Sequence, residues 1–210
     1  MIDAEIMMAL ASFAMTCFVI ELTPGPNMGY LAVLSATNGR RAGFAAVAGV
    51  ALGLLVLGLA AALGLAAAIS ASPLLYEALR WGGIVYLLYL AWDGWRESVA
   101  PLEMVPSLTS ADAKYFRRGL MTNLLNPKAA LFYVAILPGF VDSSRPVVMQ
   151  TVLLSLVFVA IATSIHLAVV TLAGTANRFM QNDRNRRVVG RGLSLLLAAI
   201  AVWFAWSTRA

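Results

Sequence analysis

Two short motifs, ELTPGPN at residues 21–27 and NLLNPK at residues 123–128, interrupt two long apolar stretches of the chain. Pro26 and Pro127 are separated by close to half of the 210 residues. Proline in a helix removes a backbone donor and collides with the carbonyl group one turn earlier. The two prolines around Gly25 should therefore end a helix rather than bend it, and Asn126-Pro127 is expected to act likewise. The motifs predict two helices that are broken at equivalent places in the two halves of the chain.

The composition is typical of a membrane protein. Hydrophobic residues make up 61% of the chain, charged residues only 12%, and the mean hydropathy is +0.83. A soluble domain carries about 25% charged residues. Residues 43–75, 147–177 and 192–208 contain no Asp, Glu, Lys or Arg, and runs of roughly 17–25 apolar residues suffice for a spanning helix. The pI of about 9.8 does not indicate nucleic-acid binding, because the basic residues lie between apolar stretches.

The apolar stretches predict an all-α membrane protein with six transmembrane helices. We place them at about residues 5–38, 42–70, 74–95, 115–140, 147–174 and 188–207, with the first broken at 23–27 and the fourth at 126–127. The N-terminal stretch opens with acidic residues instead of the basic region of a signal peptide, so we expect it to be retained as the first span. The polar segment 97–114 is interpreted as a linker between repeat one (about 1–96) and repeat two (about 115–210) of a single integral membrane domain, 1–210.

Lysine and arginine are distributed unevenly between the two sides of these predicted spans. Eleven of the 15 lie in the segments that follow the first, third and fifth spans, and three lie on the other side. Cytoplasmic loops carry the excess of Lys and Arg, so both termini are predicted to face outward, on the periplasmic side. Three spans per half is an odd number, and the halves therefore enter the membrane with opposite polarity. The broken helices then converge from opposite sides, as inverted repeats do around the central site of a transporter.

The residues at the two breaks favour a small zwitterion as the bound species. Asn126 is a good N-cap and Pro127 suits the first helical position, so the second break presents the positive end of a helix. Lys128 adds a cation there, whereas Glu21 and the backbone carbonyls of about residues 20–23 provide negative charge at the first break. A carboxylate can bind the cationic side and an ammonium the anionic side, and an amino acid carries both. The candidate substrate-binding residues are Glu21, Thr23, Pro24, Gly25, Pro26, Asn27, Asn123, Asn126, Pro127 and Lys128.

Simpler alternatives stay open for several polar residues. Lys128 can snorkel to the cytoplasmic interface, and Glu21 can lie near an interface if the first span is tilted. His166 is the only histidine; it is interpreted as an interhelical hydrogen-bonding residue, with a proton-relay role as the alternative. The single cysteine, Cys17, rules out an intrachain disulfide and a cysteine metal cluster, and it is expected to be a packing residue.

The spacing of glycine residues indicates close packing of helices, and the motifs that are not visible argue against several classes of function. Gly39 and Gly43, and again Gly49 and Gly53, are spaced four residues apart, which favours close approach of neighbouring helices. No nucleophile–base arrangement and no metal-ligand cluster are visible, so we predict no enzyme activity, no catalytic residue, no metal site and no cofactor. A redox carrier would need paired cysteines. A non-transporting scaffold would leave the two breaks unexplained, and an ion channel or metal exporter stays as an alternative.

Five segments carry a family resemblance. They are TPGPNM at 23–28 with GRRAG at 39–43, the stretch GLMTNLLNPKAALF at 119–132, the pair GG at 82–83, and WDGWR at 92–96. Together they resemble the signatures of the LysE/RhtB-type amino-acid exporter family, over nearly the whole chain. One departure is Pro138-Gly139-Phe140, where a Pro-Gln-Phe-like element is expected. Glu21 is not a fixed part of the family pattern, so its role rests on the charge argument alone.

The resemblance implies a location and an activity. It implies a multi-pass secondary transporter of the inner (plasma) membrane that exports amino acids or close derivatives from the cytoplasm, driven by the proton motive force. The partners would be a small-molecule substrate, the lipid bilayer and a second copy of the chain in a homodimer, with no nucleic acid. The alternative function is an exporter or channel for another small solute or a metal ion.

Overall fold

The computed structural model describes residues 4–23, 25–64, 72–97, 108–175 and 183–207, and its regular elements in these ranges are all helical. In chain order they are α1 (Ala4–Leu22), α2 (Pro26–Ala62), α4 (Pro73–Glu97), α5 (Leu108–Leu124), α6 (Pro127–Leu131), the π-helical turn η2 (Phe132–Ile136), the 3₁₀ turn η3 (Leu137–Phe140), α7 (Val147–Ala173) and α8 (Asp183–Ser207). The predicted all-α class is confirmed. Pro24 and most of the predicted linker lie outside the described residues.

Some of these helices are long and apolar enough to cross a membrane. Among the described residues, Pro26–Ala62 and Val147–Ala173 meet that requirement alone, and the bent pair Asp112–Leu124 and Pro127–Phe140 can form a third span. Met7–Leu22 is a shorter apolar helix. The count of six spans therefore stays a prediction. Large apolar side chains nevertheless cover the outside of the bundle on α1, α7 and α8, where water would penalise so many exposed carbon atoms and lipid would not.

The first predicted break is confirmed in position. Helix α1 ends at Leu22 and α2 begins at Pro26, so the interruption falls within the predicted break at residues 23–27. Gly25 precedes α2 in an extended conformation with no side-chain cap. The backbone N–H of Thr23 donates to the carbonyl oxygen of Ile20 at 3.1 Å. This carbonyl, one of those expected to provide negative charge at the break, therefore already has a partner. The helix tightens its last turn and thereby uses one of the orphan acceptors itself.

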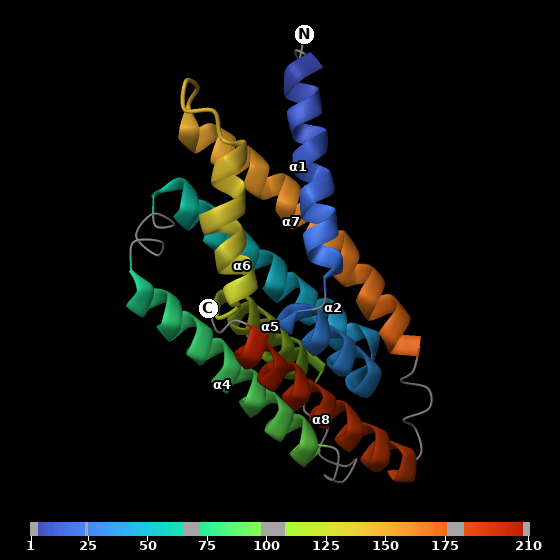
Figure 1. Cartoon of the computed structure of the whole chain (residues 1–210). Coiled ribbons are helices and arrows are strands. Elements are labelled where there is room, and N and C mark those ends of the chain that lie inside the picture. Colours follow the sequence, from blue (N-terminus) through green and yellow to red (C-terminus); the bar gives the residue numbers. More distant parts are fainter. Residues whose placement is uncertain (1–3, 24, 65–71, 98–107, 176–182, 208–210) are drawn as a thin grey trace.

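The second predicted break is also confirmed. Helix α5 ends at Leu124, and the chain bends by 49° before continuing through α6. The side chain of Asn126 accepts a hydrogen bond from the backbone N–H of Lys128 at 3.0 Å, and Pro127 occupies the first turn, as predicted. In Figure 1 the chain descends along α1 to the first break and rises away from the second break along α6. The two broken segments therefore run in opposite directions.

Helix α2 folds back on itself at Gly39, between the first and second predicted spans. Gly39 has φ 85° and ψ 171°, a backbone conformation that L side chains rarely adopt. Ser35 and Gly43 would lie about 12 Å apart along a straight helix. Instead, a Cβ atom on Gly43 would lie only 2.2 Å from the Ser35 hydroxyl oxygen. The short first leg of α2 therefore packs against the long second leg.

Glycine lets the long leg of α2 pack directly on the α5 backbone. A Cβ atom on Gly49 would lie 2.0 Å from the carbonyl oxygen of Phe116, and one on Gly119 would lie 2.1 Å from the carbonyl oxygen of Ala46. A Cβ on Gly53 would lie 2.8 Å from the Asn123 amide nitrogen. The close approach predicted from the glycine spacing is confirmed. This contact fixes α5, and with it the second break, against α2.

The predicted end of the linker needs correction. Helix α5 begins at Leu108, so residues 108–114 are helical and not part of the linker. An ion pair explains the early start: Arg41 of α2 donates to the carboxylate of Asp112, with Nη2 2.8 Å from Oδ2. The pair joins the first turns of α5 to the helix on which it packs. Helices α4 and α8 run side by side along the opposite flank of the bundle (Figure 1).

Candidate functional site

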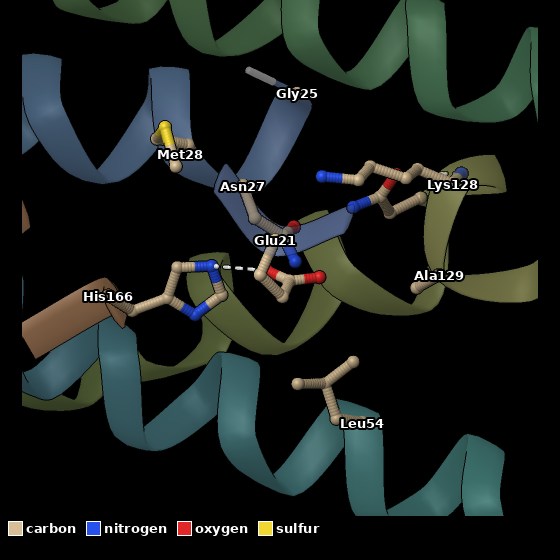
Figure 2. Close-up of a pocket in the computed structure, with 9 residues that line it drawn as sticks. Glu21, Gly25, Asn27, Met28, Leu54, Lys128, Ala129 and His166 are labelled. Carbon is tan, nitrogen blue, oxygen red and sulfur yellow. Dashed lines mark hydrogen bonds and ion pairs between the residues drawn. The ribbon is translucent and has the colours of Figure 1, made fainter. Parts of the chain in front are cut away.

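The two breaks meet around a small polar cavity. Its volume is about 10 Å³, which is about the space that one water molecule needs. Figure 2 shows residues that line it, contributed by α1, α2, α6, α7 and the two breaks. They are Glu21, Gly25, Asn27, Met28, Leu54, Asn126, Lys128, Ala129 and His166. Residues about a hundred positions apart in the sequence thus share one site.

Glu21 forms the anionic side of the cavity. Glu21 is 8% exposed, and its carboxylate lies against the imidazole of His166, with Oε2 3.4 Å from Nε2. His166 is 1% exposed and comes from the middle of α7, so the contact joins the first break to the fifth predicted span. The prediction that His166 contacts another helix is confirmed. Protonation of the imidazole would turn this contact into a buried ion pair.

Lys128 forms the cationic side, and its side chain reaches across to the first break. Its Nζ atom donates to the backbone carbonyl oxygen of Thr23 at 2.7 Å. The aliphatic stem passes over Gly25, where an added Cβ atom would lie 3.1 Å from the Lys128 Cδ atom. In this structure Lys128 turns into the protein rather than snorkelling away from the break. Thr23 follows the last residue of α1, where carbonyl groups lack partners within the helix, and Lys128 supplies a donor to one of them.

A pair of asparagines links the breaks directly. The Nδ2 atom of Asn27 donates to the Oδ1 atom of Asn123 at 2.7 Å, and both side chains are buried. The other amide atoms of this pair, Asn27 Oδ1 and Asn123 Nδ2, have no hydrogen-bond partner, and neither do His166 Nδ1 and Thr163 Oγ1. Such orphaned groups cost about 1–3 kcal/mol each. Two of these atoms, on Asn27 and His166, belong to residues that line the cavity, so part of its wall is arranged for something other than stability.

The predicted site residues are largely brought together. Glu21, Gly25, Asn27, Asn126 and Lys128 line the cavity. Thr23 and Asn123 bond to lining residues, and Pro26 and Pro127 occupy the first helical positions behind them. Pro24 lies outside the described residues.

Sequence reasoning did not assign four lining residues to the site, namely Met28, Leu54, Ala129 and His166. A signal existed only for His166, since it is the one titratable group in an apolar stretch of about thirty residues. The other three are ordinary apolar residues, and their place at the cavity follows from helix packing alone. Among the described residues, no group of three or more His, Cys, Asp or Glu side chains could hold a metal ion.

Two larger cavities lie elsewhere between the helices. The first, of about 370 Å³, is apolar, lies between α2 and α8, and shares Gly25 and Met28 with the central cavity. The second, of about 530 Å³, lies between α1, η3 and α7, and is lined by Ala9 and Leu10 together with Asp142 and Arg145. About 18 Å of helix separates Ala9 from Glu21. Open spaces of ligand size therefore flank the polar centre.

Comparisons with known proteins place the chain among transport proteins. The model of a family described as LysE type translocator matches residues 18–208. A homoserine/homoserine lactone efflux protein of Salmonella typhimurium is 24% identical over 194 residues, which cover 92% of this chain and 94% of that protein. An uncharacterized membrane protein of Pseudomonas aeruginosa is 32% identical over 199 residues and 91% of both chains. No solved structure matches the chain.

Proposed function

Because the chain belongs to the LysE type translocator family, we propose that this multi-pass membrane protein exports amino acids or close derivatives from the cytoplasm. The observation that carries the proposal is the pairing of opposite charges across one buried cavity. Glu21 lies at the first break and Lys128 at the second, and both line the same cavity. Ionisable residues are costly inside a membrane, and they mark substrate pathways.

The two charged sides match the two ends of a zwitterion. A substrate carboxylate would take the Lys128 ammonium and the N-terminal end of α6, where the backbone N–H groups point toward the break. A substrate ammonium would take the Glu21 carboxylate and the Thr23 carbonyl oxygen that Lys128 now occupies. The orphaned atoms of Asn27 and Asn123 would bond a polar side chain. The relatives that are named for homoserine efflux make L-homoserine the first substrate to test.

The central cavity is far smaller than an amino acid, so transport requires the breaks to separate. In the proposed cycle the site opens alternately toward two sides of the membrane. The apolar cavity beside Ala32 and Ala36 would receive substrate from the cytoplasm, and the cavity beside Asp142 and Arg145 would release it outside. Small residues on the first leg of α2 leave room in this cytoplasmic-side cavity for a substrate. Each larger cavity reaches the volume of about 300 Å³ or more that small-molecule sites require.

The proposed architecture follows from the sequence pattern. One domain, 1–210, would contain six spans as two inverted three-helix repeats, with both termini outside the inner membrane. The opposite directions of the two broken segments in Figure 1 support this arrangement. The proton motive force would drive export, and two copies would associate as a homodimer. Blue native electrophoresis and cysteine-accessibility mapping of both termini test the dimer and the orientation.

Reconstitution tests the proposed function. Purified protein in lipid vesicles should exchange internal for external radiolabelled L-homoserine, and a panel of other amino acids should compete to different extents. Glu21→Gln and Lys128→Met each remove one charge of the proposed site and should lower exchange at least about tenfold, which corresponds to about 1.4 kcal/mol. Lys114→Met and Glu77→Gln make the same chemical changes at positions that do not line the cavity, and they should transport normally.

Three results would contradict this function. Exchange of no amino acid by the wild-type protein would exclude an amino-acid carrier. A substrate-independent conductance in planar bilayers would favour a channel instead. Equal losses in the site variants and their controls would show that the central charges have no special role. Membrane insertion of every variant is checked by its yield in the detergent-extracted membrane fraction.

A further inference from the structure

The contact between Glu21 and His166 places two titratable groups at the same point of the cavity (Figure 2). Among the described residues, the other titratable groups that interact with Glu21 are Lys128 of α6, Tyr133 of η2 and Cys17, one turn earlier on α1. Neutral tyrosine and cysteine carry no charge near neutral pH, and Lys128 is already cationic. Histidine is the side-chain type that serves as a proton shuttle in proteins, and His166 is the histidine placed in contact with the Glu21 carboxylate.

The net charge of Glu21, Lys128 and His166 together depends on whether His166 carries a second proton. With neutral His166, the Glu21 carboxylate and the Lys128 ammonium give no net charge, and a zwitterion can be added without a charge imbalance. With protonated His166, the Glu21 carboxylate already has a cationic partner 3.4 Å away. A substrate ammonium would then meet an imidazolium beside the acid that should bind it. The proton and the substrate ammonium compete for one carboxylate.

We propose that Glu21 and His166 form the proton-coupling pair of the transporter, in which an imidazolium and a substrate ammonium bind Glu21 alternately. This inference rests on the proposed function and assigns its coupling step to two side chains. On the cytoplasmic side, the substrate ammonium binds Glu21, and the Nε2 proton leaves His166 for cytoplasmic water. On the outer side, a proton from the external water binds Nε2, the imidazolium takes Glu21, and the substrate leaves with its own charges unchanged.

The scheme fixes the stoichiometry and the electrical behaviour of transport. One proton enters the cell for each zwitterion that leaves, so each cycle moves one positive charge inward. Both the pH gradient and the membrane potential should therefore drive export. A pH difference of about two units can then support about a hundredfold accumulation of substrate, since each pH unit equals a factor of ten.

The test compares wild type with His166→Gln. Glutamine places an amide nitrogen near the Nε2 position and can still donate to Glu21, but it cannot carry the proton. Vesicles at about pH 6 inside and about pH 8 outside span the range over which histidine titrates. Wild type should accumulate external L-homoserine many-fold, whereas His166→Gln should reach only equal concentrations. Exchange without a gradient should stay measurable in His166→Gln and become independent of pH. Ser164→Ala, an exposed change on the same helix, is the control and should accumulate like wild type.

A second measurement needs no variant. Addition of L-homoserine to weakly buffered, purified wild type should release protons, up to one per bound substrate, read with a pH-sensitive dye. Absence of proton release, or gradient-driven accumulation by His166→Gln equal to that of wild type, would overturn the coupling pair alone, provided that wild type transports. If wild type neither exchanges nor accumulates any amino acid, the proposed function itself is wrong and the coupling pair falls with it.

Discussion

Replacement of Gly49 by alanine is the sharpest test of how α2 holds α5 in place. The added Cβ atom would lie 2.0 Å from the carbonyl oxygen of Phe116 and 2.7 Å from the backbone nitrogen of Leu120. These are backbone atoms, which no side-chain rotation can move. A carbon and a carbonyl oxygen come no closer than about 3.3 Å even in favourable contacts. The two helices would therefore have to separate by about 1.3 Å.

The energy of that separation can be estimated from core substitutions. Overpacking a tight contact costs about 1–3 kcal/mol, and occasionally more. Alanine is the better helix former, by about 0.8–1.0 kcal/mol, but this gain is smaller than the upper part of that range. For a chain of this length each kcal/mol shifts the melting temperature by about 2–4 °C. After that gain is subtracted, the net cost is at most about 2 kcal/mol, so Gly49→Ala should melt up to about 9 °C below wild type.

The only cysteine of the chain provides the assay. Cys17 is fully buried, so a thiol-reactive fluorescent dye reports unfolding during a temperature ramp in detergent. Gly192→Ala is the matched control, because it is the same change within helix α8 and its added Cβ atom would have no neighbour within 4 Å. Gly192→Ala should melt at or slightly above the wild-type temperature. Equal melting temperatures for Gly49→Ala and Gly192→Ala would refute the backbone contact.

Three further predictions use the same melting and transport assays. The Cβ atom of Gly53→Ala would lie 2.8 Å from the Asn123 amide nitrogen, which belongs to a movable side chain. This variant should lower transport several-fold, and its melting temperature should be closer to that of wild type than the melting temperature of Gly49→Ala. Ala32→Phe would fill the apolar cavity between α2 and α8 and should slow transport with little change in melting. The Ser144 hydroxyl holds the pKa of the Asp142 carboxyl below its usual range, so this stabilisation exists above the unfolded-state pKa and is lost as pH falls through the lower folded-state value. The melting temperature of Asp142→Asn should therefore fall less between neutral and acidic pH than that of wild type. A fall equal to that of wild type would contradict this reasoning.

The sequence predicted the parts of this fold that depend on local chemistry. Proline has the same effect on any helix, so the breaks near Pro26 and Pro127 could be located to within one or two residues. An N-cap is decided by neighbours in the sequence, and Asn126 takes that role. The reversal at Gly39 fell between two predicted spans because it follows the end of an apolar run and uses a glycine.

The composition of the cavity could not be predicted in the same way. Leu54 and Ala129 line the cavity only because of how the helices around it pack together, and nothing in their own sequence neighbourhood indicates this position. The contact between Glu21 and His166 spans 145 positions of the chain. The start of α5 at Leu108 was missed because a polar segment is typical of a linker, and the ion pair that supports it involves a distant arginine.

The contacts around the central cavity also give a reason why the proposed carrier would not let protons or substrate cross the membrane without coupling. When the site is closed without substrate, Lys128 is bound to the Thr23 carbonyl and Glu21 faces His166. Hydrogen bonds to charged groups contribute about 1.5–3 kcal/mol each, but Glu21 gains its share only if His166 carries a proton. With neither proton nor substrate, closing the site would bury the Glu21 carboxylate without a cationic partner beside it, and such burial is strongly unfavourable. The protein would therefore close, and change the side to which it opens, only with a proton or a substrate bound. This condition couples proton movement to substrate movement. Glu21→Gln removes the cost of burying the carboxylate, so the empty variant should be able to change the side to which it opens without a bound proton.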